Sequence, residues 1–82
     1  MSQPTIEQLL EFERDHPSHG YGKEALIRSE LHVAPARFYQ LLGRAIQTED
    51  ALRFDAELTH RLRRKSAAAL EARQRRIPGS TR

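Results

Sequence analysis

Apolar residues recur along this chain at intervals of three and four, and no stretch shows the strict alternation of apolar and polar residues that is typical of a β-strand. Residues at this spacing lie on one face of a helix, so the pattern predicts an all-α fold. The first helix is expected to begin at Thr5, because Thr5 and Gln8 have the spacing of a capping box. One face of this helix holds Ile6, Leu9, Leu10 and Glu13, with Phe12 beside it.

A loop and a second helix follow. Pro17 and the Gly20-Tyr21-Gly22 stretch end the first helix. The second helix is predicted from about Lys23 to Leu31, with a break at residues 32–33. Its apolar residues are Ala25, Leu26, Ile27 and Leu31.

Three more helices are predicted from capping residues. Pro35 suits the first turn of a third helix, which we expect to continue to about Gln47. Thr48, with two acidic residues after it, is a good cap for a short helix that ends near Phe54. Asp55 can cap a last helix that extends through residues 56–69.

The second and third helices have the arrangement of a helix-turn-helix unit, in which two short helices are joined by a turn of about three or four residues. Its helices share few contacts, so the unit needs apolar residues at fixed places, which here are Ile27, Leu31, Val33, Phe38 and Leu41. Arg28 stands where the pattern prefers a small residue, so it must point past the third helix. His32 stands where the pattern prefers Gly, and His can adopt the left-handed conformation at some cost. Any three-helix core could also show this spacing.

The third helix divides into two faces at 100° per residue. The core face is predicted to hold Phe38, Leu41, Leu42, Ala45 and Ile46. The opposite face carries Ala36, Gln40 and Gly43, flanked by Arg37 and Arg44 on one side and Tyr39 on the other. No acidic residue lies between positions 34 and 47, although the body of the chain is acidic.

This outer face is suited to double-stranded DNA. Gln can bond an adenine edge, Arg can bond a guanine edge or a phosphate, and Tyr hydroxyls commonly bond phosphate. Small residues such as Ala36 and Gly43 let a helix sit deep in a groove. Alternatives stay open: ordinary solvated surface for Arg37 and Arg44, and partial burial against the first helix for Tyr39. Gly43 could instead serve close packing or only weaken the helix, by roughly 1 kcal/mol.

Charge is distributed unevenly along the chain. Residues 1–60 hold six Lys or Arg and ten Asp or Glu, a net charge of −4. Residues 61–82 hold eight Lys or Arg and one Glu, a net charge of +7. We therefore predict a helical domain over residues 1–66 and a basic extension over residues 67–82 that is partly helical and then disordered after Pro78-Gly79-Ser80. Such asymmetry suggests an arm for a polyanion, although a solvated tail would look the same.

The basic stretch has several possible uses. Its first cations, Arg61, Arg63, Arg64 and Lys65, point all round a helix and could position it on a phosphate backbone. A second use is dimerisation through Leu58, Leu62, Ala69 and Leu70. Binding of RNA through the arm alone is a third.

Several short motifs occur in one order along about residues 9–65. They are Phe12-Glu13-Arg14, Gly22-Lys23-Glu24, Ile27-Arg28, Arg37-Phe38-Tyr39-Gln40, Leu42, Ala51-Leu52, Asp55, Leu58 and Arg61-Leu62-Arg63-Arg64. Together they resemble a family of small actinobacterial and actinophage proteins that carries a domain-of-unknown-function label and is described as helix-turn-helix. The resemblance implies an all-helical fold and DNA binding, with no known target.

The chain departs from that family in four places. Asp15-His16 replaces a Trp pair, which puts the packing of the first loop in doubt, and Ala34 replaces a Ser cap. Glu49 replaces a Pro before the short helix. Gly43 replaces an Asn, which could alter the choice of target.

Other classes of protein are not expected. The chain has no cysteine, and His16 with His19 lacks further metal ligands nearby, so no metal or cofactor is predicted. Gly22-Lys23 lacks the preceding strand and glycine of a phosphate loop, and no catalytic triad is positioned, so we expect no enzyme. No signal peptide or apolar run of about 20 residues is present, which predicts a cytoplasmic protein without a membrane span.

The sequence thus favours a sequence-specific DNA-binding protein, a small transcriptional regulator that binds as a homodimer. Gln40, Arg37 and Arg44 are the expected base contacts, while Tyr39 and Arg28, with the cations of 61–65, would position the backbone. The alternative is a protein–protein module that docks on the transcription machinery, such as RNA polymerase. Its acidic first helix, with Glu7, Glu11, Glu13 and Asp15, would then meet a basic partner.

Overall fold

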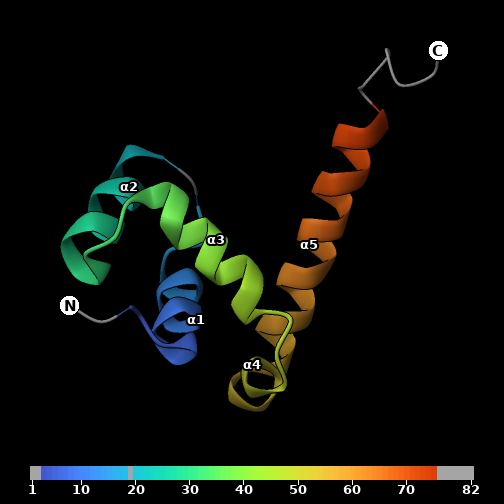
Figure 1. The fold of residues 1–82 in the computed structure, drawn as a ribbon, viewed down its shortest axis with the longest axis horizontal. Helices are drawn as coiled ribbons and strands as arrows, with labels where there is room; N and C mark the ends of the chain where they lie inside the picture. Colours follow the sequence, from blue (N-terminus) through green and yellow to red (C-terminus); the bar gives the residue numbers. More distant parts are fainter. Residues whose placement is uncertain (1–2, 19, 76–82) are drawn as a thin grey trace.

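A computed structural model describes residues 3–18 and 20–75, and within them the chain forms helices and turns but no strand, which confirms the all-α prediction. The elements follow one another with short connections (Figure 1). In chain order they are α1 (Ile6–Asp15), α2 (Tyr21–Leu26), the π-helical turn η1 (Ile27–Leu31), α3 (Pro35–Ala45), α4 (Glu49–Phe54) and α5 (Ala56–Arg75).

The helix starts predicted from capping residues are confirmed. The Gln8 N–H donates to Thr5 Oγ1 at 3.0 Å, and the Thr5 N–H donates to Gln8 Oε1 at 2.8 Å, which completes the capping box. The Ala51 N–H donates to Thr48 Oγ1 at 3.1 Å. Asp55 accepts from the Leu58 N–H at 3.0 Å, so its side chain caps α5.

The turn before α3 has the predicted strained residue. His32 adopts the left-handed conformation, with φ 59° and ψ 36°, and its N–H donates to the Arg28 carbonyl at 3.1 Å. The chain then reverses into α3, where Pro35 occupies the first turn and its missing N–H removes no helical hydrogen bond. The helix predicted from about Lys23 to Leu31 differs from the observed one in two ways. α2 begins two residues earlier, at Tyr21, and it continues into the wider π-helical turn η1.

The predicted end of the third helix was misplaced. α3 ends at Ala45, two residues before the predicted end at Gln47, because the Gln47 and Thr48 N–H groups bond carbonyls three residues back and tighten the chain. The Thr48 hydroxyl also donates to the Ala45 carbonyl at 2.7 Å. α5 continues unbroken to Arg75 and so includes residues 67–75 of the predicted extension, whereas Pro78-Gly79-Ser80 lies outside the described residues.

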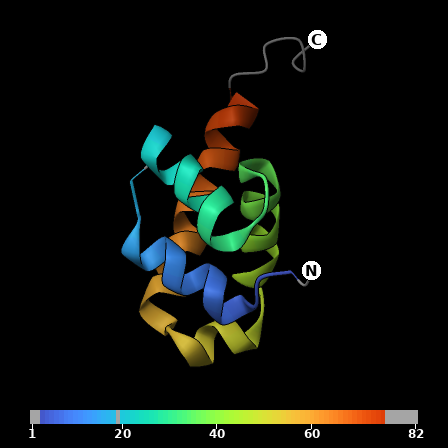
Figure 2. The same ribbon diagram turned by 90° about the vertical axis from the view of Figure 1, so that its left-hand side faces the viewer.

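The core lies where α1 packs against α3, α4 and the first turns of α5 (Figure 1, Figure 2). All five residues predicted for the core face of α3 are buried. Phe12 and Phe38 meet edge to face, with their ring centroids 5.4 Å apart. Of the apolar residues predicted for the second helix, Ile27 is buried, but Ala25 is exposed and does not contribute. The buried apolar residues are Leu9, Leu10, Phe12, Ile27, Phe38, Leu41, Leu42, Ala45, Ile46, Ala51, Leu58 and Leu62.

α5 leaves this core partway along its length. Thr59 is fully buried and its hydroxyl donates to the Ala51 carbonyl at 3.0 Å, which fastens the start of α5 to α4. The residues after Leu62 are half-buried or exposed, and the last turns extend beyond the other helices in both views (Figure 1, Figure 2). Among the described residues, no helix combines the length and the apolar character that a membrane span needs.

Candidate nucleic-acid interface

α3 presents a rigidly supported outer face. Its core side chains hold it to the rest of the domain, whereas the side chains predicted to face outward are exposed. α3 itself contains no acidic residue. The exposed residues on this face are Ala36, Arg37, Tyr39, Gln40, Gly43 and Arg44, as the helical angles predicted.

Arg37 and Gln40 form one hydrogen-bonded unit on this face. Arg37 Nη1 donates to Gln40 Oε1 at 3.3 Å, and Arg37 Nη2 donates to Gln3 Oε1 at 2.6 Å. These bonds are exposed and compete with water, so the two side chains can exchange them for bonds to another polar partner. The guanidinium and the amide are thus held side by side in the free protein.

Tyr39 lies at the other edge of the face. Its side chain is partly packed and partly exposed, so its surroundings fit both a phosphate contact and partial burial, the two roles considered from the sequence. It is 36% exposed, and its ring meets the Phe38 ring edge to face at 5.0 Å. Lys23 Nζ lies 5.6 Å from the centroid of the Tyr39 ring and 5.9 Å from that of Phe38. A cation near an aromatic ring is attracted to its face, so Lys23 supports the orientation of Tyr39.

A buried ion pair lies beneath Tyr39. Lys23 Nζ donates to Glu13 Oε1 at 2.7 Å, and the two side chains are only 2% and 5% exposed. The pair joins α1 to α2, and α1 in turn packs against α3. Glu13 was expected on an acidic surface; that expectation is wrong, because this carboxylate is enclosed with its partner.

The position of Glu13 in the sequence is a signal for this pair. Glu13 falls on the same helical face as Leu9 and Leu10, both of which are buried. A carboxylate at a core position requires a compensating cation. Lys23, ten residues away, is the buried lysine that meets this need.

A groove separates the C-terminal half of α3 from α5. Its residues are Glu13, Tyr39, Leu42, Gly43, Ile46, Leu62, Lys65 and Ser66. The apolar ones are buried and form its floor, whereas Lys65 and Ser66 are exposed and stand on its rim. A Cβ atom built on Gly43 meets no atom within 4 Å, so packing within the chain does not require a glycine there.

Replacing Gly43 with Ala is expected to raise the free energy of unfolding by about 0.5–1 kcal/mol. Gly inside a helix costs roughly this much relative to Ala, and the added methyl group has open space. Urea denaturation of both proteins, followed by circular dichroism, measures the difference. A loss of stability would show that the backbone at this position needs glycine.

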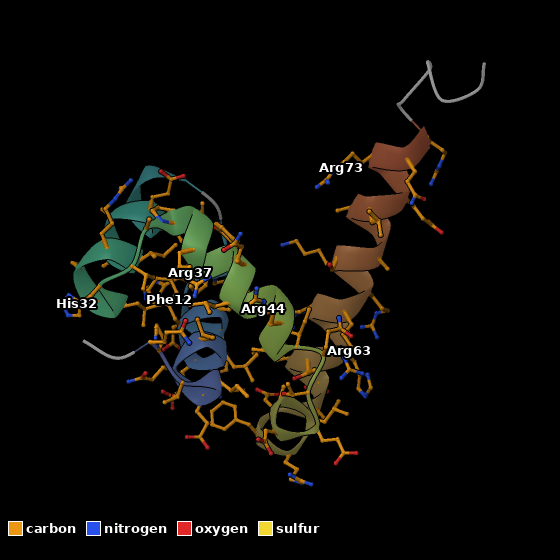
Figure 3. All side chains as sticks on the ribbon, viewed as in Figure 1. Phe12, His32, Arg37, Arg44, Arg63 and Arg73 are labelled. Atoms are coloured by element: carbon orange, nitrogen blue, oxygen red, sulfur yellow. The ribbon has the colours of Figure 1, made fainter. Side chains whose placement is uncertain are left out.

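The cations predicted on α5 have different surroundings (Figure 3). Arg63 is half-buried, and its Nε donates to the Ile46 carbonyl, so it ties α5 to the end of α3. Lys65 lines the groove. Arg61 and Arg64 are exposed.

Two residues predicted for dimerisation are engaged elsewhere. Leu58 and Leu62 lie in the core of their own chain, with 3% and 8% exposure, so the predicted dimer surface is wrong at these positions. Leu70 remains 52% exposed, and Ala69 is exposed beside it. Arg28, the predicted backbone contact outside α3 and α5, is exposed on η1.

His19, half of the histidine pair considered for a metal, lies outside the described residues. Residues 3–18 and 20–75 contain no group of three or more side chains placed to hold a metal ion.

Comparison with known proteins gives a family and no relative of known function. The family described as "Protein of unknown function (DUF3263)" matches residues 4–76, nearly the whole chain. No curated protein and no solved structure matches.

Proposed function

Since the chain belongs to the DUF3263 family, whose description assigns no activity, we propose its function from its own surface: it binds double-stranded DNA through the outer face of α3. In this proposal α2 with η1, the turn at residues 32–34 and α3 act as a helix-turn-helix, and the protein is a small sequence-specific regulator of transcription. The resemblance to actinobacterial and actinophage proteins suggests that such an organism, or its phage, encodes it and that it works in the cytoplasm.

The observation that carries the proposal is the acid-free outer face of α3 on a body whose first 60 residues have a net charge of −4. Four buried side chains, Phe38, Leu41, Leu42 and Ala45, hold this helix in place, so the face is pre-organised. The left-handed turn at His32 and the Pro start of α3 support the helix-turn-helix geometry.

The chemistry of the face fits the major groove. Gln40 can make paired hydrogen bonds to adenine, and Arg37 or Arg44 can make them to guanine. Ala36 and Gly43 keep the centre of the face low, which allows close approach. Tyr39 at the margin of this face, exposed Arg28 on η1 and exposed Arg61 on α5 would bond phosphates and set the orientation of the helix.

The test is selection of bound fragments from a genomic DNA library by the full chain, followed by affinity measurements over a salt series. We expect one enriched motif, and affinity that falls steeply as salt rises, because the release of counterions from the phosphates becomes less favourable at higher salt. Negligible affinity for every DNA pool at low salt would overturn the proposal. A motif with two-fold symmetry and half-sites about one DNA turn apart would support the proposed homodimer.

The variant Gly43→Ala also tests close approach of α3 to DNA. We expect its affinity for the selected site to fall about tenfold while its stability rises, because the methyl group projects from the centre of the face. Fluorescence anisotropy with the selected duplex measures this. Unchanged affinity would mean that the glycine only weakens the helix.

A second candidate function is docking on the transcription machinery through the acidic surface of α1. The exposed residues Glu7, Glu11 and Asp15 support it, whereas Glu13 does not contribute. Glu7 also lines a groove between α1 and α4 together with Asp50. Capture of a basic partner that survives changes on α3 would favour this function.

A further inference from the structure

The groove between α3 and α5 has an apolar floor and a polar rim. Its floor is apolar and formed by Leu42, Ile46 and Leu62, and its rim on the α5 side carries Lys65 and Ser66. Its rim on the α3 side carries Tyr39 and Gly43, which also border the outer face of α3. A ligand bound to the outer face of α3 therefore lies next to the opening of this groove.

One stripe of α5 extends this rim beyond the body. Ala69 lies four residues after Lys65, and Arg73 four residues after Ala69, so the three share a helical face. The same face begins with the buried Leu58 and Leu62, and therefore turns toward α3. Figure 3 shows Arg73 projecting from the side of α5 that faces α3.

Resting on the proposed function, we propose that this inner stripe of α5 follows the phosphate backbone of one DNA strand while α3 occupies the adjacent major groove. A helix in the major groove is flanked by a backbone on either side, and α5 stands along the Tyr39 edge of α3. Lys65 and Arg73 are about 12 Å apart along the helix axis. That length spans about three phosphates of one strand, at about 3.4 Å each along the DNA axis.

The charge of α5 favours a DNA phosphate backbone, rather than a second copy of the chain, as the partner of this stripe. The apolar floor, with exposed Leu70 nearby on α5, would otherwise suit a symmetric pairing of two α5 helices. Residues 61–75, however, carry six cations and the single acid Glu71, which lies 3.7 Å from Arg75. Two such helices side by side would repel each other, whereas a phosphate strand is attracted.

The test compares salt dependence of binding to the selected duplex for the full chain and three variants. The double variant Lys65→Ala/Arg73→Ala is expected to reduce the slope of log affinity against log salt by about 2, which is one unit for each phosphate contact. The charge-matched control Arg53→Ala/Arg75→Ala removes two exposed cations that already pair with acids, and it should leave the slope within about half a unit. Arg64→Ala, which removes a neighbour of Lys65 on another face, should change the slope by less than Lys65→Ala.

Three results would overturn the inference while wild-type DNA binding stood. The control, or Arg64→Ala, could reduce the slope as much as the inner-stripe variant. The inner-stripe variant could change sedimentation-derived mass instead of the slope, which would assign the groove to a second copy. The inner-stripe variant could also lose affinity for single-stranded RNA alone and keep the wild-type slope on the duplex. If the wild-type chain bound no duplex at low salt, the proposed function itself would fail first. Circular dichroism of each variant confirms that the fold is kept.

Discussion

Replacing Lys23 with Met is expected to lower the free energy of unfolding by about 3–5 kcal/mol, the largest loss we predict for a polar residue of this chain. The variant leaves the Glu13 carboxylate buried without the ammonium group that now lies 2.7 Å away. A domain of this size has a total stability of about 4–12 kcal/mol, so the loss would remove about a quarter of that stability or more. Urea denaturation followed by circular dichroism measures the change.

Two further variants separate the loss of the charge partner from the loss of packing. Glu13→Leu/Lys23→Met removes both charges, and it should recover most of the stability, since a buried ion pair is commonly no more stable than an apolar replacement. Arg53→Met breaks the exposed pairs with Glu49 and Asp50 and should cost less than about 1 kcal/mol. A double variant as unstable as Lys23→Met would show that the lysine stem, lying against Phe38 and Tyr39, matters more than the charge.

The sequence predicted the parts of the fold that depend on neighbours along the chain. Thr5, Thr48 and Asp55 mark helix starts correctly because each bonds an N–H three residues away. The left-handed turn at His32 and the core face of α3 were also predictable, since both follow from local backbone geometry and helical period. The residue at which α5 ends was not predictable, because its alanine-rich turns are exposed and depend on helix propensity alone, with no burial pattern to mark the end.

The sequence predicted which residues of α3 are exposed, but not the contacts that hold the neighbouring helices beside α3. Exposure of the α3 face follows from the angle of each residue around one helix. The pairing of Glu13 with Lys23, and that of Arg63 with the Ile46 carbonyl, joins residues 10 and 17 positions apart on different elements. Helical period places Glu13 beside Leu9 and Leu10, but no local pattern specifies its partner, and none distinguishes Arg63 from the free cations.

Replacing Arg37 and Gln40 together with Ala is expected to reduce affinity for the selected DNA site by about 30-fold or more. Each paired hydrogen bond to a base edge contributes about 1–3 kcal/mol of discrimination, and both side chains stand on the acid-free face of α3. Their mutual bond at 3.3 Å is exposed, so its loss should hardly change stability. Fluorescence anisotropy with the selected duplex and with a scrambled duplex measures the effect.

The scrambled duplex distinguishes a contact that specifies sequence from one that only supplies charge. We expect the double variant to lose affinity for the selected site much more than for the scrambled duplex, because it keeps Lys65 and Arg73, the proposed backbone contacts. Glu7→Gln/Glu11→Gln, on the exposed face of α1, is the control and should leave DNA specificity intact. If Arg37→Ala/Gln40→Ala kept full specificity while the α1 variant lost a protein partner, the outer face of α3 would not be a DNA-reading surface, and the acidic surface of α1 would become the functional one.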